Sequence, residues 1–177
     1  MIEGCREGRH KEQKLLFDQY AGAMLAVCTR YVRNGADAEE LMLNGFYKFF
    51  SQVNRFVYNG QGSIAPWLRK IMINECLMFL RKKGQLIMKN EQAVEETGYD
   101  EEATGRLSAT ELFTYITQLP AGYRTVFNLY VIEEMSHKEI AVLLNISEGT
   151  SKSQLSKARL QLQQIIKQKG AYHERFR

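Results

Sequence analysis

Cysteine, proline and histidine are all scarce in this sequence, and the first and last of these exclude whole classes of site. The three cysteines are widely spaced and form no CxxC pair, so we expect free thiols in a reducing compartment rather than a disulfide framework or a zinc site. The three histidines lie far apart, and no phosphate-binding or dinucleotide-binding glycine motif is present. We therefore expect no enzyme, no metal, no cofactor and no small-molecule substrate.

The sequence also lacks a long apolar run. No stretch approaches the ~18 consecutive apolar residues of a membrane span. Residues 1–14 are polar and mixed in charge, without the apolar segment of a signal peptide. We therefore expect a cytoplasmic protein that is not itself a membrane protein.

Charge is distributed unevenly along the chain. Residues 1–90 carry 14 Lys and Arg against 8 Asp and Glu, and residues 103–177 carry 10 against 6. Between them, residues 91–102 carry 6 acidic side chains and no basic one. Basic lobes favour polyanionic partners, because each neutralised phosphate releases condensed counterions. The pattern indicates two nucleic-acid-binding lobes on either side of an acidic segment.

The two prolines are widely separated, strand-like alternation is nearly absent and apolar residues recur at helical spacing, which predicts an all-α fold. The spacing predicts helices over 10–33 and 65–83, with a helix capped by Asp37 between them. Further helices follow from Ser108, which has capping-box spacing to Glu111.

Residues 85–107 lose this periodicity and are rich in acidic and small residues. This composition favours a flexible acidic linker; the alternative is a short surface helix with an acidic face. The predicted organisation is therefore two small helical domains, at residues 10–84 and 108–170, joined by a linker at residues 85–107.

The segment from Ser136 to Leu160 has the layout of a helix-turn-helix. Ser136 and Glu139 have capping-box spacing, Ala141 is small enough for a helix crossing, and Ile146 can plug the turn. Ser147 can cap the second helix. The alternative is an ordinary amphipathic helix with a solvated polar face.

Helical angles divide that second helix into two sides. Leu155, Ala158, Leu162 and Ile165 are expected to pack inward. The polar and basic side chains are suited to base edges and phosphates in a major groove. The residues predicted to bind DNA here are Thr150, Lys152, Ser153, Gln154, Lys157 and Arg159.

A second basic surface is expected on the helix at 65–83, where Lys70, Asn74 and Arg81 fall within about 40° of one another. Phe56 and Tyr58 in the preceding loop are either core residues or platforms for unpaired bases, and Trp67 is expected to be core. The residues predicted to bind DNA here are Asn59, Lys70, Asn74, Arg81 and Lys82.

The helix after Asn34-Gly35 combines acidic and apolar side chains, which suits a protein partner with apolar anchors inside a polar rim. The residues predicted to form this surface are Asp37, Glu39, Glu40, Leu41, Met42 and Phe46.

Taken in order, these elements resemble the extracytoplasmic-function sigma factors, the minimal two-domain members of the bacterial sigma family. The resemblance covers residues 12–168. AEELMLNGFYKFF (38–50) is similar to the family's core-polymerase-binding helix, and WLRKIMINECLMFLRKK (67–83) to its −10-reading helix. LPAGYRTVFNLYVIEEMSHKEIAVLLNISEGTSKSQLSKARLQL (119–162) is similar to its −35-reading domain.

The resemblance implies a chain that binds the clamp of RNA polymerase core and directs initiation at promoter DNA. It also implies an anti-sigma partner and an acidic linker that threads toward the RNA exit channel. The alternative is a stand-alone helix-turn-helix regulator. The chain departs from the family pattern at Leu43-Asn44, where a Gln-Glu pair is usual, and at Met78, Ser151 and Gln154.

Overall fold

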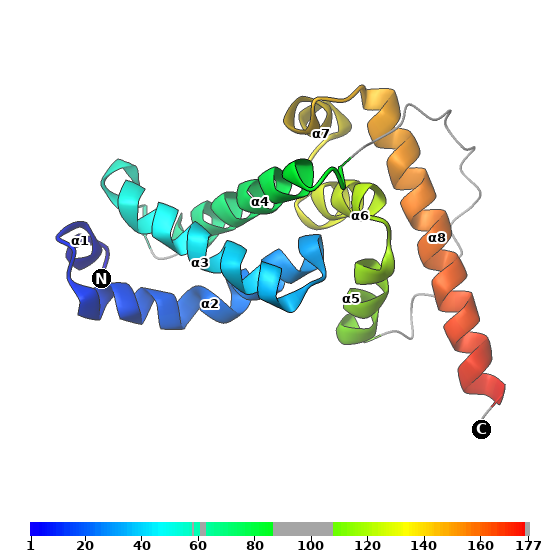
Figure 1. Cartoon of the computed structure of the whole chain (residues 1–177), viewed down its shortest axis with the longest axis horizontal. Helices are drawn as coiled ribbons and strands as arrows, with labels where there is room; N and C mark the ends of the chain where they lie inside the picture. Colours follow the sequence, from blue (N-terminus) through cyan, green and yellow to red (C-terminus); the bar gives the residue numbers. More distant parts are fainter. Residues whose placement is uncertain (58, 61–62, 87–107, 176–177) are drawn as a thin grey trace. The chain divides into compact units, whose positions relative to one another are not determined.

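The computed structural model describes residues 1–57, 59–60, 63–86 and 108–175, with side chains up to residue 169. Every regular element in these residues is helical, which confirms the all-α prediction (Figure 1). The chain divides into two compact units, Met1–Lys83 and Gly84–Arg177. The expected linker at 85–107 falls almost wholly outside the described residues. The elements are α1 (Ile2–Arg6), α2 (His10–Val32), α3 (Gly35–Gln52), η1 (Val53–Arg55), α4 (Ile64–Lys82), α5 (Ala109–Gln118), α6 (Ala121–Phe127), η4 (Asn128–Ile132), α7 (His137–Leu144) and α8 (Glu148–Arg175).

Unit 1 is built on α2, α3 and α4, which pack against one another in pairs (Figure 1). An aromatic cluster lies where η1 and α4 meet α3. The Phe49 ring lies 4.9 Å from that of Trp67, and the Phe56 ring stacks on Trp67 at 4.8 Å. Phe56 is buried and Trp67 half-buried, so both contribute to the core. Large apolar side chains buried at helical spacing supply the main stabilisation of this unit.

The start of α3 differs from the sequence prediction. Asn34, not Asp37, is the N-cap, because its Oδ1 accepts a hydrogen bond from the Asp37 amide at 3.0 Å. Asp37 lies in the first turn, where its negative charge interacts favourably with the positive end of the helix dipole. Its carboxylate also pairs with Lys83 Nζ at 3.2 Å, which ties the end of α4 to the start of α3.

The short helix α1 was not predicted. Five residues are too few for a stable helix in isolation, so its order depends on tertiary contacts. Ile2 and Cys5 are buried, and a Cβ at Gly4 would lie 2.4 Å from the Glu12 side chain. A larger residue at this position would force the Glu12 side chain to move, so the close approach of α1 to α2 favours glycine here.

Unit 2 contains α5 to α8. Both predicted capping boxes are confirmed, with Ser108 paired to Glu111 and Ser136 paired to Glu139. Arg124 is buried, and its Nη1 donates to the Leu119 carbonyl at 2.6 Å and to the Thr117 carbonyl at 3.2 Å. This guanidinium satisfies carbonyls at the end of α5 and so fixes the corner between α5 and α6.

No helix in the described residues is long and apolar enough to cross a membrane. The three cysteines are free and buried. The described residues also hold no cluster of acidic, histidine or cysteine side chains that could bind a metal ion.

Candidate nucleic-acid interface

The helix-turn-helix geometry is present in unit 2. Asn145 adopts a left-handed conformation (φ 56°) at the end of α7, and the Ile146 amide donates to the Ala141 carbonyl at 3.0 Å. Ser147 then caps α8, because its Oγ accepts from the Thr150 amide at 2.9 Å. Ala141 is buried and Ile146 is half-buried. The predicted cap is confirmed, Ala141 is buried as a crossing residue would be, and Ile146 is only partly buried in the turn.

The inward side of α8 follows the prediction in all but one residue. Leu155, Ala158 and Leu162 are buried against α6 and α7, but Ile166 is buried in place of Ile165, which is half-buried. The helix has 3.6 residues per turn, so the buried side can continue from Leu162 to a residue three or four positions later. Here it continues to Ile166, four positions on.

The basic side chains of α8 are the accessible part of its predicted DNA-binding surface. Lys152 is exposed, and Lys157 and Arg159 are half-buried. The helix therefore presents positive charge from Lys152 in its second turn onward, after an acidic residue, Glu148, in its first turn.

Three polar residues of α8 do not form the open surface that we expected. Thr150, Ser153 and Gln154 are 4%, 1% and 3% exposed. The hydroxyls are satisfied within the helix, since Thr150 Oγ1 hydrogen-bonds Ser147 Oγ at 2.9 Å and Ser153 Oγ donates to the Thr150 carbonyl at 3.0 Å. Short hydroxyl side chains that bond their own backbone tolerate burial, so polarity alone did not predict exposure.

His137 ties the two helices of the motif together. Its ring stacks on Tyr130 with centroids 4.4 Å apart, and its Nδ1 hydrogen-bonds Ser151 Oγ at 2.9 Å. This contact explains why a polar residue is tolerated at Ser151, where the resemblance led us to expect an apolar one. The pKa of His137 is lowered, mainly by burial of the ring and to a smaller extent by the positive charges of Lys152 and Arg159.

Acidification is expected to destabilise unit 2 through His137. Because its pKa in the folded chain is below the ordinary value of 6.5, the unfolded chain binds more protons once the pH falls below that value. The free energy of unfolding then decreases until His137 titrates in the folded state. The protection factors of amides in α7 and α8 should therefore fall as the pH drops below about 6.5, so that exchange accelerates relative to the intrinsic rate of an unfolded peptide at the same pH.

The matched variants are His137→Gln, which keeps a polar partner for Ser151, and His10→Gln in unit 1. We expect the pH-dependent acceleration to shrink in the first variant and to stay as in the wild type in the second. The same acceleration in the first variant as in the wild type would contradict the role of His137.

Unit 1 presents a basic stripe along α4. Lys70, Asn74 and Arg81 are exposed as predicted, and Met78 lies between them on the same surface. Lys82 is exposed at the end of the helix. The opposite side of α4 is buried along its length, so the stripe lies on a rigid support. The exposed residues Lys70, Asn74, Arg81 and Lys82 are called here the α4 stripe.

The segment between η1 and α4, described at Phe56, Val57, Asn59, Gly60 and Ser63, is the α4 loop. Val57 and Asn59 are exposed. Ser63 Oγ donates to the Gly60 carbonyl at 2.7 Å and accepts from the Asn59 amide at 3.2 Å. Gly60 has φ 93°, a conformation that favours glycine. The loop therefore presents Asn59 to solvent before the start of α4, while Tyr58 lies outside the described residues.

The predicted protein-binding surface of α3 requires a correction. Leu41, Met42 and Phe46 are buried, and the Phe46 ring lies 4.8 Å from that of Phe17 on α2. These three belong to the core, because they share the side of α3 that faces α2 and α4. The exposed side carries Leu43 and Tyr47, which are 54% and 75% exposed. The accessible surface, called here the α3 stripe, consists of Glu39, Glu40, Leu43, Asn44 and Tyr47.

Both units match models of the same protein family. Residues 16–85 match "Sigma-70 region 2" and residues 109–162 match "Sigma-70, region 4". The chain belongs to the sigma-70 family. Members of this family act with RNA polymerase in transcription initiation and are not enzymes, and a stand-alone regulator is not favoured.

Individual relatives carry the same description. The chain is 24% identical to the ECF RNA polymerase sigma-E factor of Haemophilus influenzae, over 94% of this sigma factor and 93% of that protein. It is 24% identical to the ECF RNA polymerase sigma factor SigM of Bacillus subtilis, over 72% and 78%. A solved structure of the sigma factor RpoE from Bartonella quintana, in complex with the anti-sigma factor NepR, shares the fold with a TM-score of 0.53 and 23% identity, over 89% of this chain and 98% of that one.

Proposed function

We propose that each unit of this sigma factor binds a separate part of the promoter while the α3 stripe holds RNA polymerase core. In this proposal the α4 stripe and Asn59 bind the −10 element, and α8 binds the −35 element. The observation that carries it is the order of the two matched regions, each with an exposed basic helix surface. The chain then acts as a specificity subunit in the cytoplasm, and polymerase supplies the catalysis.

The roles within α8 follow from accessibility. Lys152 is the side chain best exposed for a phosphate, with Lys157 and Arg159 further along the helix. Contact of Thr150, Ser153 and Gln154 with base edges requires the first two turns of α8 to be uncovered when the unit binds DNA. We also propose domains at residues 10–84 and 108–170 with a linker at 85–107.

An anti-sigma factor is the further partner that we propose. The support is the similar RpoE structure, which was solved with the anti-sigma factor NepR. The exposed apolar residues of the α3 stripe offer such a partner a way to compete with polymerase.

The direct test of the proposed function is transcription by purified core polymerase from a promoter library, with and without the chain. We expect the chain to create a set of new transcript start sites that share upstream sequences at the −10 and −35 positions. Initiation that never exceeds that of core alone would overturn the proposal.

Lys152→Ala is expected to weaken binding of the reconstituted holoenzyme to promoter DNA. Loss of one phosphate contact should reduce the slope of log affinity against log salt by about 1. Lys167→Ala is the matched control, because Lys167 is an exposed lysine about 22 Å further along the same helix. Equal slopes for both variants and the wild type would remove Lys152 from the interface.

A further inference from the structure

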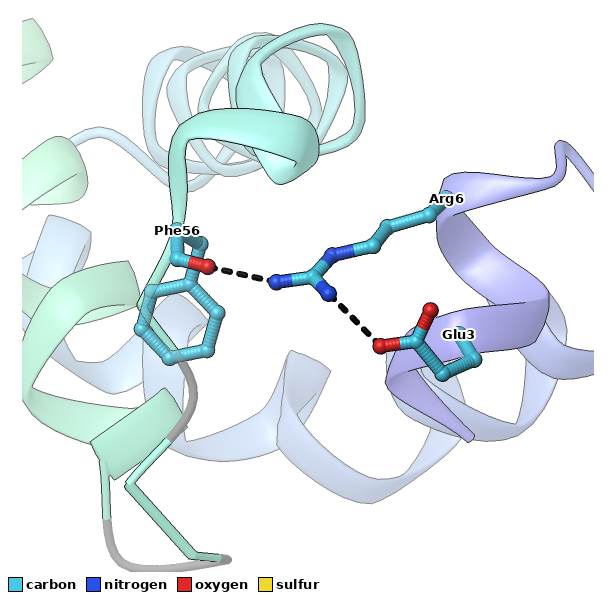
Figure 2. A network of polar contacts seen from close by, with 3 residues as sticks. All are labelled: Glu3, Arg6 and Phe56. Atoms are coloured by element: carbon cyan, nitrogen blue, oxygen red, sulfur yellow. Dashed lines mark hydrogen bonds and ion pairs between the residues drawn. The ribbon is translucent and has the colours of Figure 1, made fainter.

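The short helix α1 contacts the start of the α4 loop through one side chain. Arg6 Nη2 donates to the Phe56 carbonyl at 2.7 Å, across 50 residues of sequence. Its Nη1 donates to Glu3 Oε1 at 2.6 Å. Figure 2 shows the guanidinium between the carbonyl and the carboxylate. The Arg6 side chain is only 28% exposed, so this charged hydrogen bond is partly shielded from water.

Phe56 is the last fixed residue before the exposed part of the α4 loop. Its amide donates to the Val53 carbonyl at 3.1 Å, and its buried ring stacks on Trp67. The next residue, Val57, is 72% exposed. Because a peptide unit is planar, holding the Phe56 carbonyl fixes the direction in which the chain enters the loop. Ser63 holds the other end of the same loop through Gly60.

Arg6 is itself held in place from several sides. Glu3 orients the guanidinium, while Ile2 and Cys5 bury the apolar side of α1. The match to sigma-70 region 2 begins at residue 16, so α1 and its contact with the loop lie outside the matched range. The contact is therefore carried by a part of the chain that the family model does not describe.

We propose that Arg6 is a positioning residue for promoter opening, which acts through the Phe56 carbonyl to orient Val57 and Asn59 for the −10 strand. Arg6 does not contact DNA in this mechanism. The proposal rests on the proposed function of the loop. Residues that are already oriented lose less conformational entropy when they bind an unpaired strand, so binding is stronger for the same contacts.

The test compares Arg6→Met with Arg9→Met in the reconstituted holoenzyme. Arg9 is a matched control, because it lies nearby and forms ion pairs with Glu7 and Glu12. Opening is followed by the fluorescence of 2-aminopurine placed in the −10 element, and loop order by amide exchange at Val57, Asn59 and Gly60. We expect Arg6→Met to reduce the opening equilibrium constant by about tenfold, the factor for one charged hydrogen bond, and to accelerate exchange at these amides.

Two further measurements separate positioning from a general loss of structure. Arg6→Lys, which keeps the charge but has a single donating nitrogen, should restore part of the opening, and core affinity should be unchanged in all variants. Arg6→Met should also lower discrimination between the preferred −10 sequence and a substituted one, which a uniform loss of folded protein does not do.

The outcomes distinguish this inference from the proposed function. If the wild type directs specific initiation but Arg6→Met matches Arg9→Met in opening and exchange, the positioning role is wrong. Normal opening by Arg6→Met despite accelerated exchange also overturns it. If the wild type directs no specific initiation, the proposed function fails, and the inference falls with it even where the exchange result shows that the anchor exists.

Discussion

Leu43→Asp and Tyr47→Ala are each expected to weaken binding of the chain to core RNA polymerase by roughly thirtyfold, or about 2 kcal/mol. These side chains are 54% and 75% exposed, so changing them removes little from the folded unit. In an interface they can fill apolar pockets and exclude water, which is how a few anchors dominate binding energy. Fluorescence anisotropy of the labelled chain, titrated with core, measures the effect.

Leu15→Asp is the control for this prediction. Leu15 is 53% exposed on α2, so the substitution introduces the same charge at a similar exposure in the same unit. We expect it to bind core as the wild type does. An equal loss in all three variants would mean that the effect is nonspecific and would remove the α3 stripe from the interface.

Reversing two charges on the α4 stripe is expected to have the largest effect on promoter opening. The double variant Lys70→Glu, Arg81→Glu removes two charged contacts at about 1.5 kcal/mol each, so open complexes should form roughly a hundredfold less readily. The loss should be greatest at low salt, and the slope of log opening constant against log salt should become shallower. Permanganate footprinting of the melted −10 thymines across a salt series measures both quantities.

A charge-matched control for the α4 stripe is the double variant Arg9→Glu, Lys14→Glu. Both residues are exposed near the start of α2, and the change in net charge is the same. We expect this control to alter opening only slightly. If the two double variants behave alike, the effect comes from the total charge of the protein and not from contacts along α4.

The sequence was sufficient where local interactions decide the structure. The capping boxes at Ser108 and Ser136 and the cap at Ser147 depend on neighbours within about one turn, and these signals can be read without the fold. The α4 stripe was predicted for the same reason. Three polar residues share one side of a mainly apolar helix, so that side must face the solvent while the other sides are buried.

The errors had two causes: contacts distant in sequence for α1, and local signals within α3 and α8 that were given too little weight. Helix α1 has no periodicity of its own and is ordered by burial of Ile2 and Cys5 against other elements. Phe46 was assigned to the surface because its helix also carries acidic residues, although its spacing from Met42 already placed it on the buried side. Ser153 was assigned to the surface as a polar residue, but its hydroxyl bonds the Thr150 carbonyl of its own helix.

The packing of α3 against α4 has a consequence for how the two partners meet. Lys48 pairs with Glu75 at 2.5 Å and Lys83 pairs with Asp37, so the two helices are joined at the middle and at one end. The direct packing of α3 on α4, together with these ion pairs, sets the relative orientation of the α3 stripe and the α4 stripe. In the proposed complex, polymerase bound to the α3 stripe holds the α4 stripe in a fixed orientation toward the promoter DNA. Binding of the α4 stripe to that DNA is then intramolecular and occurs at a high effective concentration.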